Sequence, residues 1–201
     1  MPRIGSPDKG FPSPSGGRTV AHVRVLAVTT LHDGVLGAVA PLGLAAAVET
    51  ALVIDLDPSG PPYPSRKSLA DLVVDGPRRE DLVPTRRGLA VLRNGGIGWE
   101  LAADLVEALA RSWPAVVLRS PEPSSAFPNV PVVPLLPGVL APRGSEPAVY
   151  QTTMVGERPP GPGPVLPRLC RPVVVRLLNG VVEPRSRWVR AWRQVWDWQW
   201  H

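Results

Sequence analysis

The sequence contains little of the chemistry on which most catalytic and metal-binding sites depend. Its 201 residues include one cysteine, Cys170, three histidines, and lysine only at Lys9 and Lys67. A single cysteine excludes an internal disulfide and a cysteine-based zinc site. No stretch reaches the roughly 18 apolar residues expected of a membrane-spanning helix. The polar first 18 residues lack the apolar segment of a signal peptide, so we expect a cytoplasmic protein, or one peripheral on the inner face of the membrane.

Arginine supplies almost all of the positive charge, and the formal net charge is +5. Arginine pairs with phosphate or carboxylate, so an anionic partner stays possible, but we interpret this excess as unclustered, which makes it weak evidence for nucleic acid. Nucleic-acid binding is expected to be unlikely, because the basic pairs at 78–79 and 86–87 have no aromatic residues between them. A hydrophobic content of 44% is sufficient for the core of one domain.

Apolar runs alternate with helical patterns along most of the chain. The expected strands are 23–28, 51–55, 89–92, 115–118 and 130–136, with 173–178 as a candidate last strand, and the expected helices are 38–49, 68–74 and 99–112. Pro41 should then lie in the first helical turn. In helix 99–112 the expected apolar face is Leu101, Leu105, Ala108 and Leu109. Continuous apolar strands that alternate with helices predict a mostly parallel sheet covered on both faces, an α/β domain.

The expected organisation has three parts. Residues 1–20 are predicted to form a flexible arm, and residues 21–180 the α/β domain, with a proline-rich loop at 156–168. Residues 181–201 are predicted to form a separate C-terminal amphipathic helix.

The loop after the first strand lies where a nucleotide-binding domain would hold phosphates. Such a loop uses backbone N–H groups freed by glycines, a lysine on the phosphates and a Ser/Thr hydroxyl on magnesium. Residues 30–39 read TLHDGVLGAV, with Gly34 and Gly37 but without a lysine. Asp33 adds negative charge to this segment.

Three ordered segments resemble the ParA/MinD family of deviant-Walker ATPases, over roughly residues 22–140. They are 25–30 (VLAVTT) with the loop and helix after it, 52–60 (LVIDLDPSG), and 68–72 (SLADL) followed by 82–96. The resemblance implies a three-layer domain of the P-loop type. Some members of the family that the chain resembles end in an amphipathic membrane-targeting helix, so the resemblance also suits such a helix at the end of this sequence.

The chain departs from the family pattern at the positions that carry the chemistry. The resemblance places His32 and Gly37 at the two lysine positions, and Ala38 and Val39 at the hydroxyl positions. Arg119 ends the strand where the family has an acidic residue. Phosphoryl transfer depends on positioning and charge stabilisation by the missing groups. We therefore predict a pseudo-ATPase with no catalytic residue, cofactor or metal.

The degenerate loop (His32, Asp33, Gly34, Gly37 and Ala38) and the retained Asp55 and Asp57 are the residues at which a nucleotide would otherwise be held. Asp55 and Asp57 are interpreted as turn-forming residues after a strand. Arg119 could place a positive charge near the former phosphate site, so binding without hydrolysis stays an alternative.

The last residues combine tryptophan and arginine at helical spacing. The apolar set is Trp188, Val189, Trp192, Val195 and Trp196, bordered by Trp198 and Trp200, with Arg187, Arg190 and Arg193 opposite. Indoles with arginines suit a helix lying in an anionic membrane interface. Tryptophan equally suits a protein contact, either with this domain, with a second copy or with a partner. Both interpretations stay open on the sequence.

The function that follows is that of a non-catalytic scaffold or adaptor. It would position a membrane-associated or polar assembly of the secretion, pilus, division or segregation type. It would act through protein partners and the tail at 185–201, as a homodimer or as a heterodimer with an active homologue. The alternatives are an active or partner-completed ATPase, and a subunit docked into a larger complex by its C-terminal helix.

Overall fold

A computed structural model describes residues 24–30, 34–82, 84, 88–136, 146–153, 158–183 and 185–200. Within these ranges seven strands form one sheet, in the order β3-β2-β4-β1-β5-β6-β7. The strands are β1 (Arg24–Thr30), β2 (Ala51–Asp55), β3 (Leu89–Leu92), β4 (Ala115–Arg119), β5 (Asn129–Leu135), β6 (Val149–Thr152) and β7 (Val165–Leu166). Every neighbouring pair is parallel.

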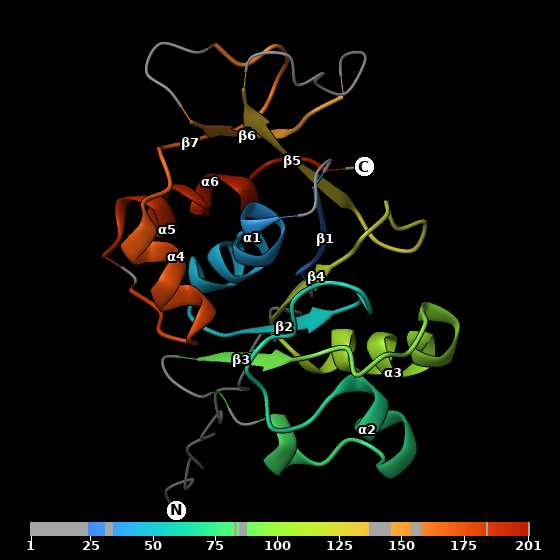
Figure 1. Cartoon of the computed structure of the whole chain (residues 1–201). Coiled ribbons are helices and arrows are strands. Elements are labelled where there is room, and N and C mark those ends of the chain that lie inside the picture. The colour runs from blue at the N-terminus through green and yellow to red at the C-terminus, as the bar shows by residue number, and fades with distance from the viewer. Residues whose placement is uncertain are drawn as a thin grey trace, which may run out of the picture.

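Helices cover both faces of this sheet (Figure 1). They are α1 (Val35–Ala46), α2 (Leu69–Asp75), the 3₁₀-helix η1 (Arg79–Leu82), α3 (Trp99–Ser112), α4 (Arg171–Leu178), α5 (Arg187–Ala191) and α6 (Arg193–Trp196). One layer consists of α1 with α4, α5 and α6 packed against it, and the other consists of α2 and α3. The predicted three-layer α/β architecture with a parallel sheet is confirmed.

Strand β2 shows why the sheet sequences are continuously apolar. All five of its residues are buried. Val53 points into the core shared with α1, whereas Leu52 and Ile54 point into the core shared with α2 and α3. Because successive side chains of a strand alternate between faces, a strand covered on both sides needs apolar residues at every position.

Helix α1 begins earlier than the sequence predicts. It starts at Val35, so Pro41 lies inside the helix and not in its first turn. Proline removes one backbone N–H from the helix interior. Ten of the twelve residues are buried, because the helix lies against the sheet and is also contacted by α4, α5 and α6. An all-round apolar sequence is typical of such a helix.

Residues 173–178 are helical, so their prediction as a strand is wrong. They belong to α4, in which Val173 and Leu177 are buried at i and i+4 while Val175 is 48% exposed. The run of β-branched residues at 173–175 favours a strand locally. Packing of one helical face against α1 overrides this preference. The short strands β6 and β7 were not predicted, and β7 falls inside the segment expected to be a proline-rich loop.

The buried face of α3 is also shifted from the predicted one. Ala102, Val106, Leu109 and Ala110 are buried, whereas Leu101 is 69% exposed. The sequence interpretation favoured the larger leucines. In the structure the small side chain of Ala102 lies in the core between α3 and the sheet.

Candidate functional site

The parallel sheet has a topological switch point at the carboxyl ends of β1 and β4. These strands are neighbours, but the chain leaves β1 for β2 on one side and leaves β4 for β5 on the other. Ligands of open α/β sheets bind in the crevice at such a point. A cavity of about 360 Å³ lies here, and its lining is Val28, Thr30, Gly37, Asp57, Pro58, Ser59, Arg119, Ser120 and Pro121.

A buried ion cluster forms one wall of this crevice. Arg119 at the end of β4 is the in-register neighbour of Asp55 at the end of β2. Its Nη1 lies 3.4 Å from Asp55 Oδ2, and its Nη2 donates to Asp57 Oδ2 at 2.9 Å. The three side chains are at most about a tenth exposed. Two carboxylates therefore hold the one cation in a largely water-free position.

The loop after β2 fixes this cluster through its backbone. Asp57 Oδ1 accepts hydrogen bonds from the Ser59 and Gly60 N–H groups, both at 2.9 Å. Asp55 Oδ1 accepts one from the Asp57 N–H at 3.1 Å. A Cβ on Gly60 would lie 1.9 Å from Arg119 Nη2, so only glycine fits there. The aspartates thus make the turn-forming bonds predicted for them, and each also pairs with Arg119.

Arg119 also contacts the loop after β2 through one further hydrogen bond and one face of its guanidinium. Nη1 donates to the Pro61 carbonyl at 2.9 Å, and the guanidinium lies 5.4 Å from the centre of the Tyr63 ring. The Tyr63 hydroxyl donates to the Ala38 carbonyl of α1 at 2.7 Å. The cation is therefore built into the connection between β2, β4 and α1, and it does not project into the cavity as a free phosphate ligand.

Burial raises the pKa of Asp55 to about 6, an effect that Arg119 counteracts. The folded state then binds more protons than the unfolded state between the ordinary pKa of an aspartate and about pH 6. The contribution of Asp55 to stability is therefore present at acidic pH and is lost as the pH rises through this window.

When the pH is raised from roughly 5 to roughly 7, we expect the urea midpoint of the wild type to decrease relative to that of Asp55→Asn. Chemical denaturation of both proteins at the two pH values measures this difference. Equal changes of midpoint in the two proteins would show that Asp55 does not titrate in this window.

The structure describes only part of the degenerate loop. His32 and Asp33 lie outside the described residues. Gly34 precedes α1, Gly37 lines the cavity, and Ala38 is buried in α1. Within the described ranges no group of three or more His, Cys, Asp or Glu side chains is placed to hold a metal ion. Tyr63 and Gly60 were not predicted, because the pairing of β2 with β4 brings their loop to Arg119.

The C-terminal segment forms two short helices that dock on the domain itself. Helices α5 and α6 meet at Trp192, and the predicted apolar set (Trp188, Val189, Trp192, Val195 and Trp196) is buried in the core shared with α1. The expectation of one separate amphipathic helix is corrected, since this set is part of the domain core. Trp198 is 39% exposed, Trp200 is partly buried against the same core, and Arg187, Arg190 and Arg193 are exposed.

The docked indoles also make specific polar contacts. Trp188 Nε1 donates to Gln151 Oε1 at 2.7 Å, and Trp196 Nε1 donates to the Leu44 carbonyl at 3.0 Å. Leu44 lies in the last turn of α1, and its carbonyl also accepts the Ala47 N–H at 3.2 Å. Trp200 Nε1 donates to the Val195 carbonyl at 2.8 Å. The tail is therefore hydrogen-bonded both to Gln151 of β6 and to the end of α1.

Gly43 of α1 permits this close docking. A Cβ there would lie 2.3 Å from a ring carbon of Trp188 and 2.6 Å from Nε1 of Trp192. Helix propensity alone would make Gly43→Ala stabilising by about 1 kcal/mol. We expect the clash to dominate and the variant to lose about 1–2 kcal/mol of unfolding free energy in urea denaturation.

The control for this prediction is Gly34→Ala. A Cβ at Gly34 meets nothing within 4 Å. This variant should change the unfolding free energy by less than about 1 kcal/mol. A Gly43→Ala variant more stable than the wild type would show that the rings do not pack this tightly.

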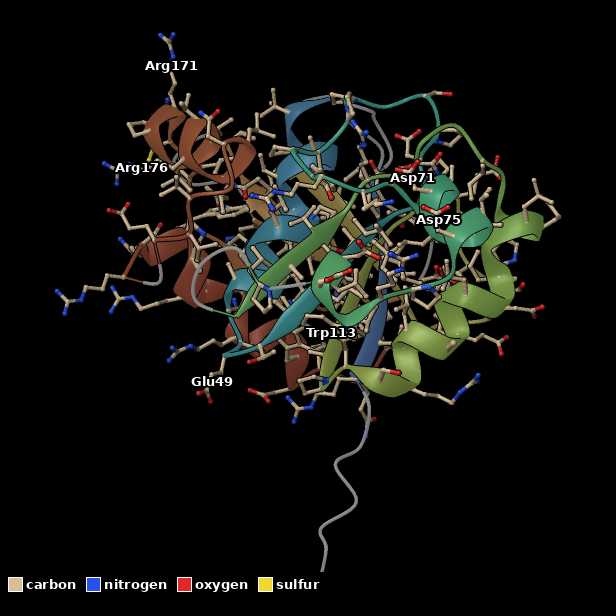
Figure 2. All side chains as sticks on the ribbon, turned by 90° about the horizontal axis from the view of Figure 1, so that it is seen from below. Glu49, Asp71, Asp75, Trp113, Arg171 and Arg176 are labelled. Atoms are coloured by element: carbon tan, nitrogen blue, oxygen red, sulfur yellow. The ribbon has the colours of Figure 1, made fainter. Side chains whose placement is uncertain are left out.

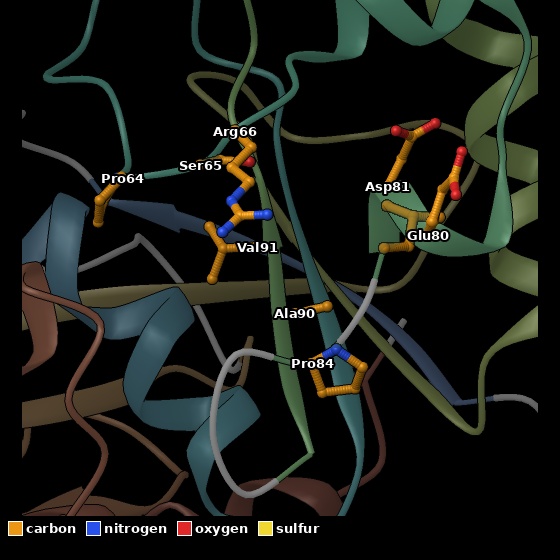
Figure 3. A pocket seen from close by; sticks show the side chains of 9 residues that line it. Pro64, Ser65, Arg66, Glu80, Asp81, Pro84, Ala90 and Val91 are labelled. Carbon is orange, nitrogen blue, oxygen red and sulfur yellow. The ribbon is translucent and has the colours of Figure 1, made fainter.

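A second cavity, of about 630 Å³, lies beside the edge strand β3 (Figure 3). Arg66 lies on one side of it, and Glu80 and Asp81 of η1 lie on the other. Its floor is Ala90 and Val91 of β3. This hollow is separate from the ion cluster and shares no lining residue with the switch-point cavity.

Comparisons with known proteins place few constraints on this chain. No family model matches the sequence, and no curated protein matches it. Among solved structures, the chain is similar to the cobyrinic acid a,c-diamide synthase from Mycobacterium smegmatis with bound ADP and magnesium. The TM-score is 0.44 at 20% identity, over 87% of this chain and 92% of that one. Across the described residues, none of the helices has the length and apolarity to cross a membrane.

Proposed function

We propose that this chain is a non-catalytic relative of the ParA/MinD-like ATPases that acts as a scaffold or adaptor through protein contacts. The assembly it positions would be a membrane-associated or polar one. The observation that carries the proposal is the Asp55–Arg119–Asp57 cluster at the switch point. Among the described residues that line the crevice, Arg119 is the one cation, and the two carboxylates neutralise it inside the protein.

The charge at the crevice also opposes a triphosphate. Two carboxylates face one guanidinium, and the segment from residue 10 to residue 66 contains no lysine that could reach the site from the loop. A phosphate-binding site normally gathers cationic groups and backbone N–H donors around the ligand. Keeping the fold without these groups suits a binding role.

The test measures nucleotide binding and hydrolysis on the full chain. We expect no heat of binding for ATP or ADP with magnesium in isothermal titration calorimetry, and phosphate release at the buffer background. Steady magnesium-dependent turnover that disappears in Asp57→Ala would overturn the proposal. Nucleotide that copurifies with the protein would favour the alternative of an ATPase with an unusual loop.

The docked tail limits which surface of the domain a partner could bind. Because Trp188, Trp192 and Trp196 are buried, lipid contact through these rings would require the tail to leave the domain. A contact that leaves the fold intact must use the outer side of the α4–α6 layer or another exposed face.

A further inference from the structure

The positive charge of the chain is concentrated in one segment. Residues 168–200 contain seven arginines and two acidic residues, a net charge of +5, which equals that of the whole chain. The other residues hold 15 basic and 15 acidic side chains and are neutral as a set. The interpretation of the excess as unclustered is therefore wrong. It failed because the seven arginines form no continuous basic run, so that only those of the tail stood out in the sequence.

The fold places five of these arginines on the three helices that pack against α1. Helices α4, α5 and α6 all contact α1, and their buried residues face it. The opposite sides of the three helices therefore point away from the molecule. We call this the arginine surface, and it consists of the exposed Arg171, Arg176, Arg187, Arg190 and Arg193 of these helices, together with the exposed Arg168 and Arg185, which precede α4 and α5. Figure 2 shows Arg171 and Arg176 extending outward from α4.

Most of this charge is not compensated within the protein. Arg176 pairs with Glu183, but the six other arginines form no ion pair with any described residue. The second acidic residue of the segment, Asp197, is exposed at the end of α6. Like charges gathered on one surface repel each other and raise the local potential, which attracts an anionic partner.

The side chains between the arginines favour a protein partner. Val175 of α4, Val181 after α4 and Trp198 after α6 are 48%, 41% and 39% exposed. Arginine and tryptophan together with apolar contacts are typical of protein interfaces. The guanidinium group also pairs bidentately with carboxylates.

Two other anionic partners fit this surface less well. A bilayer is normally entered by indoles, and in this segment only Trp198 is substantially exposed among the described tryptophans. Single-stranded nucleic acid is normally bound by exposed aromatic rings, on which its bases stack, together with a basic groove that follows the backbone. The same single tryptophan is available for stacking.

We propose that the arginine surface binds an acidic segment of a partner protein, whose Asp and Glu carboxylates pair with these arginines while its apolar residues contact Val175 and Val181. This inference rests on the proposed adaptor function and identifies its partner by chemistry. It also makes the tail an interaction element whose indole side holds the fold and whose arginine side meets the partner.

The experiment compares two charge-reversal variants of equal net charge. The first is Arg187→Glu/Arg190→Glu/Arg193→Glu on the arginine surface. The matched control is Arg66→Glu/Arg78→Glu/Arg111→Glu, which changes exposed arginines elsewhere. The probe is a fluorescein-labelled peptide of repeated Asp-Glu-Leu triplets, and its binding is followed by fluorescence anisotropy. Duplex DNA and vesicles with and without phosphatidylglycerol are tested at the same salt concentration.

We expect the wild type and the control to bind the peptide, and the first variant to bind it about tenfold more weakly or worse. Binding should weaken as salt is added. Equal peptide affinity of the two variants would overturn the proposal, as would tighter binding of DNA or anionic vesicles than of the peptide. Thermal unfolding checks that both variants are folded, and the single Arg171→Glu variant on α4 replaces the first if it is not. ATP hydrolysis by the wild type would refute the proposed function without changing these affinities.

Discussion

Replacing Trp192 by alanine is expected to remove about 3–5 kcal/mol of unfolding free energy. The side chain is fully buried where α5 meets α6, and its ring packs edge-on against Trp188 with centroids 5.4 Å apart. The buried Nε1 has no hydrogen-bond partner, so the loss measures packing and cavity formation without a broken hydrogen bond. Urea denaturation followed by circular dichroism gives the value.

Trp198→Ala is the matched control for this prediction. Trp198 belongs to the same tail but is 39% exposed and makes a tilted contact with Trp200. Its replacement should cost less than about 1 kcal/mol. If both variants lose the same small amount, the tail is not part of the core. A tail that acted only as a surface anchor would give that result.

The tail shows what a sequence pattern determines and what it leaves open. The spacing of Trp188, Trp192, Val195 and Trp196 predicts that one side is removed from water. It does not say whether lipid, a partner or the chain itself covers that side, because each of the three removes the same apolar surface from water. The decision depends on Gly43, which is distant in sequence and allows the rings to approach α1.

The fold was predictable where the apolar pattern is continuous. Strands with every residue buried, such as β2 and β4, stand out because both faces of the sheet are covered. The two last strands of the sheet and helix α4 were not predictable in the same way. Strands β6 and β7 are short, and α4 combines a β-branched sequence with a helical contact that only α1 provides.

The candidate site was predictable in its residues but not in their pairing. Asp55, Asp57 and Arg119 each end or follow a strand, so they were expected at one end of the sheet. Their direct contact requires β4 to insert between β1 and β2, an order that the sequence of elements does not specify. The arginine that could have met a phosphate instead meets two carboxylates.

The second large effect is expected for Arg119→Leu, which should destabilise the fold by about 3–5 kcal/mol at neutral pH. The substitution leaves Asp55 and Asp57 buried without their cation. The pKa of Asp55 should rise further, because Arg119 now lowers it. Part of the lost stability should therefore return as the pH falls and the carboxyl group becomes protonated.

A triple variant separates charge from packing in this cluster. Adding Asp55→Asn and Asp57→Asn to Arg119→Leu removes every buried charge but keeps side-chain oxygens that accept the N–H groups of the loop. We expect it to regain most of the stability lost by Arg119→Leu, since removing a whole buried ion cluster often costs little. Urea denaturation of the single and triple variants at neutral and acidic pH measures both effects. An Arg119→Leu protein as stable as the wild type at neutral pH would mean that the two carboxylates do not depend on this cation. Arg119 would then not be held by them and could still meet a phosphate.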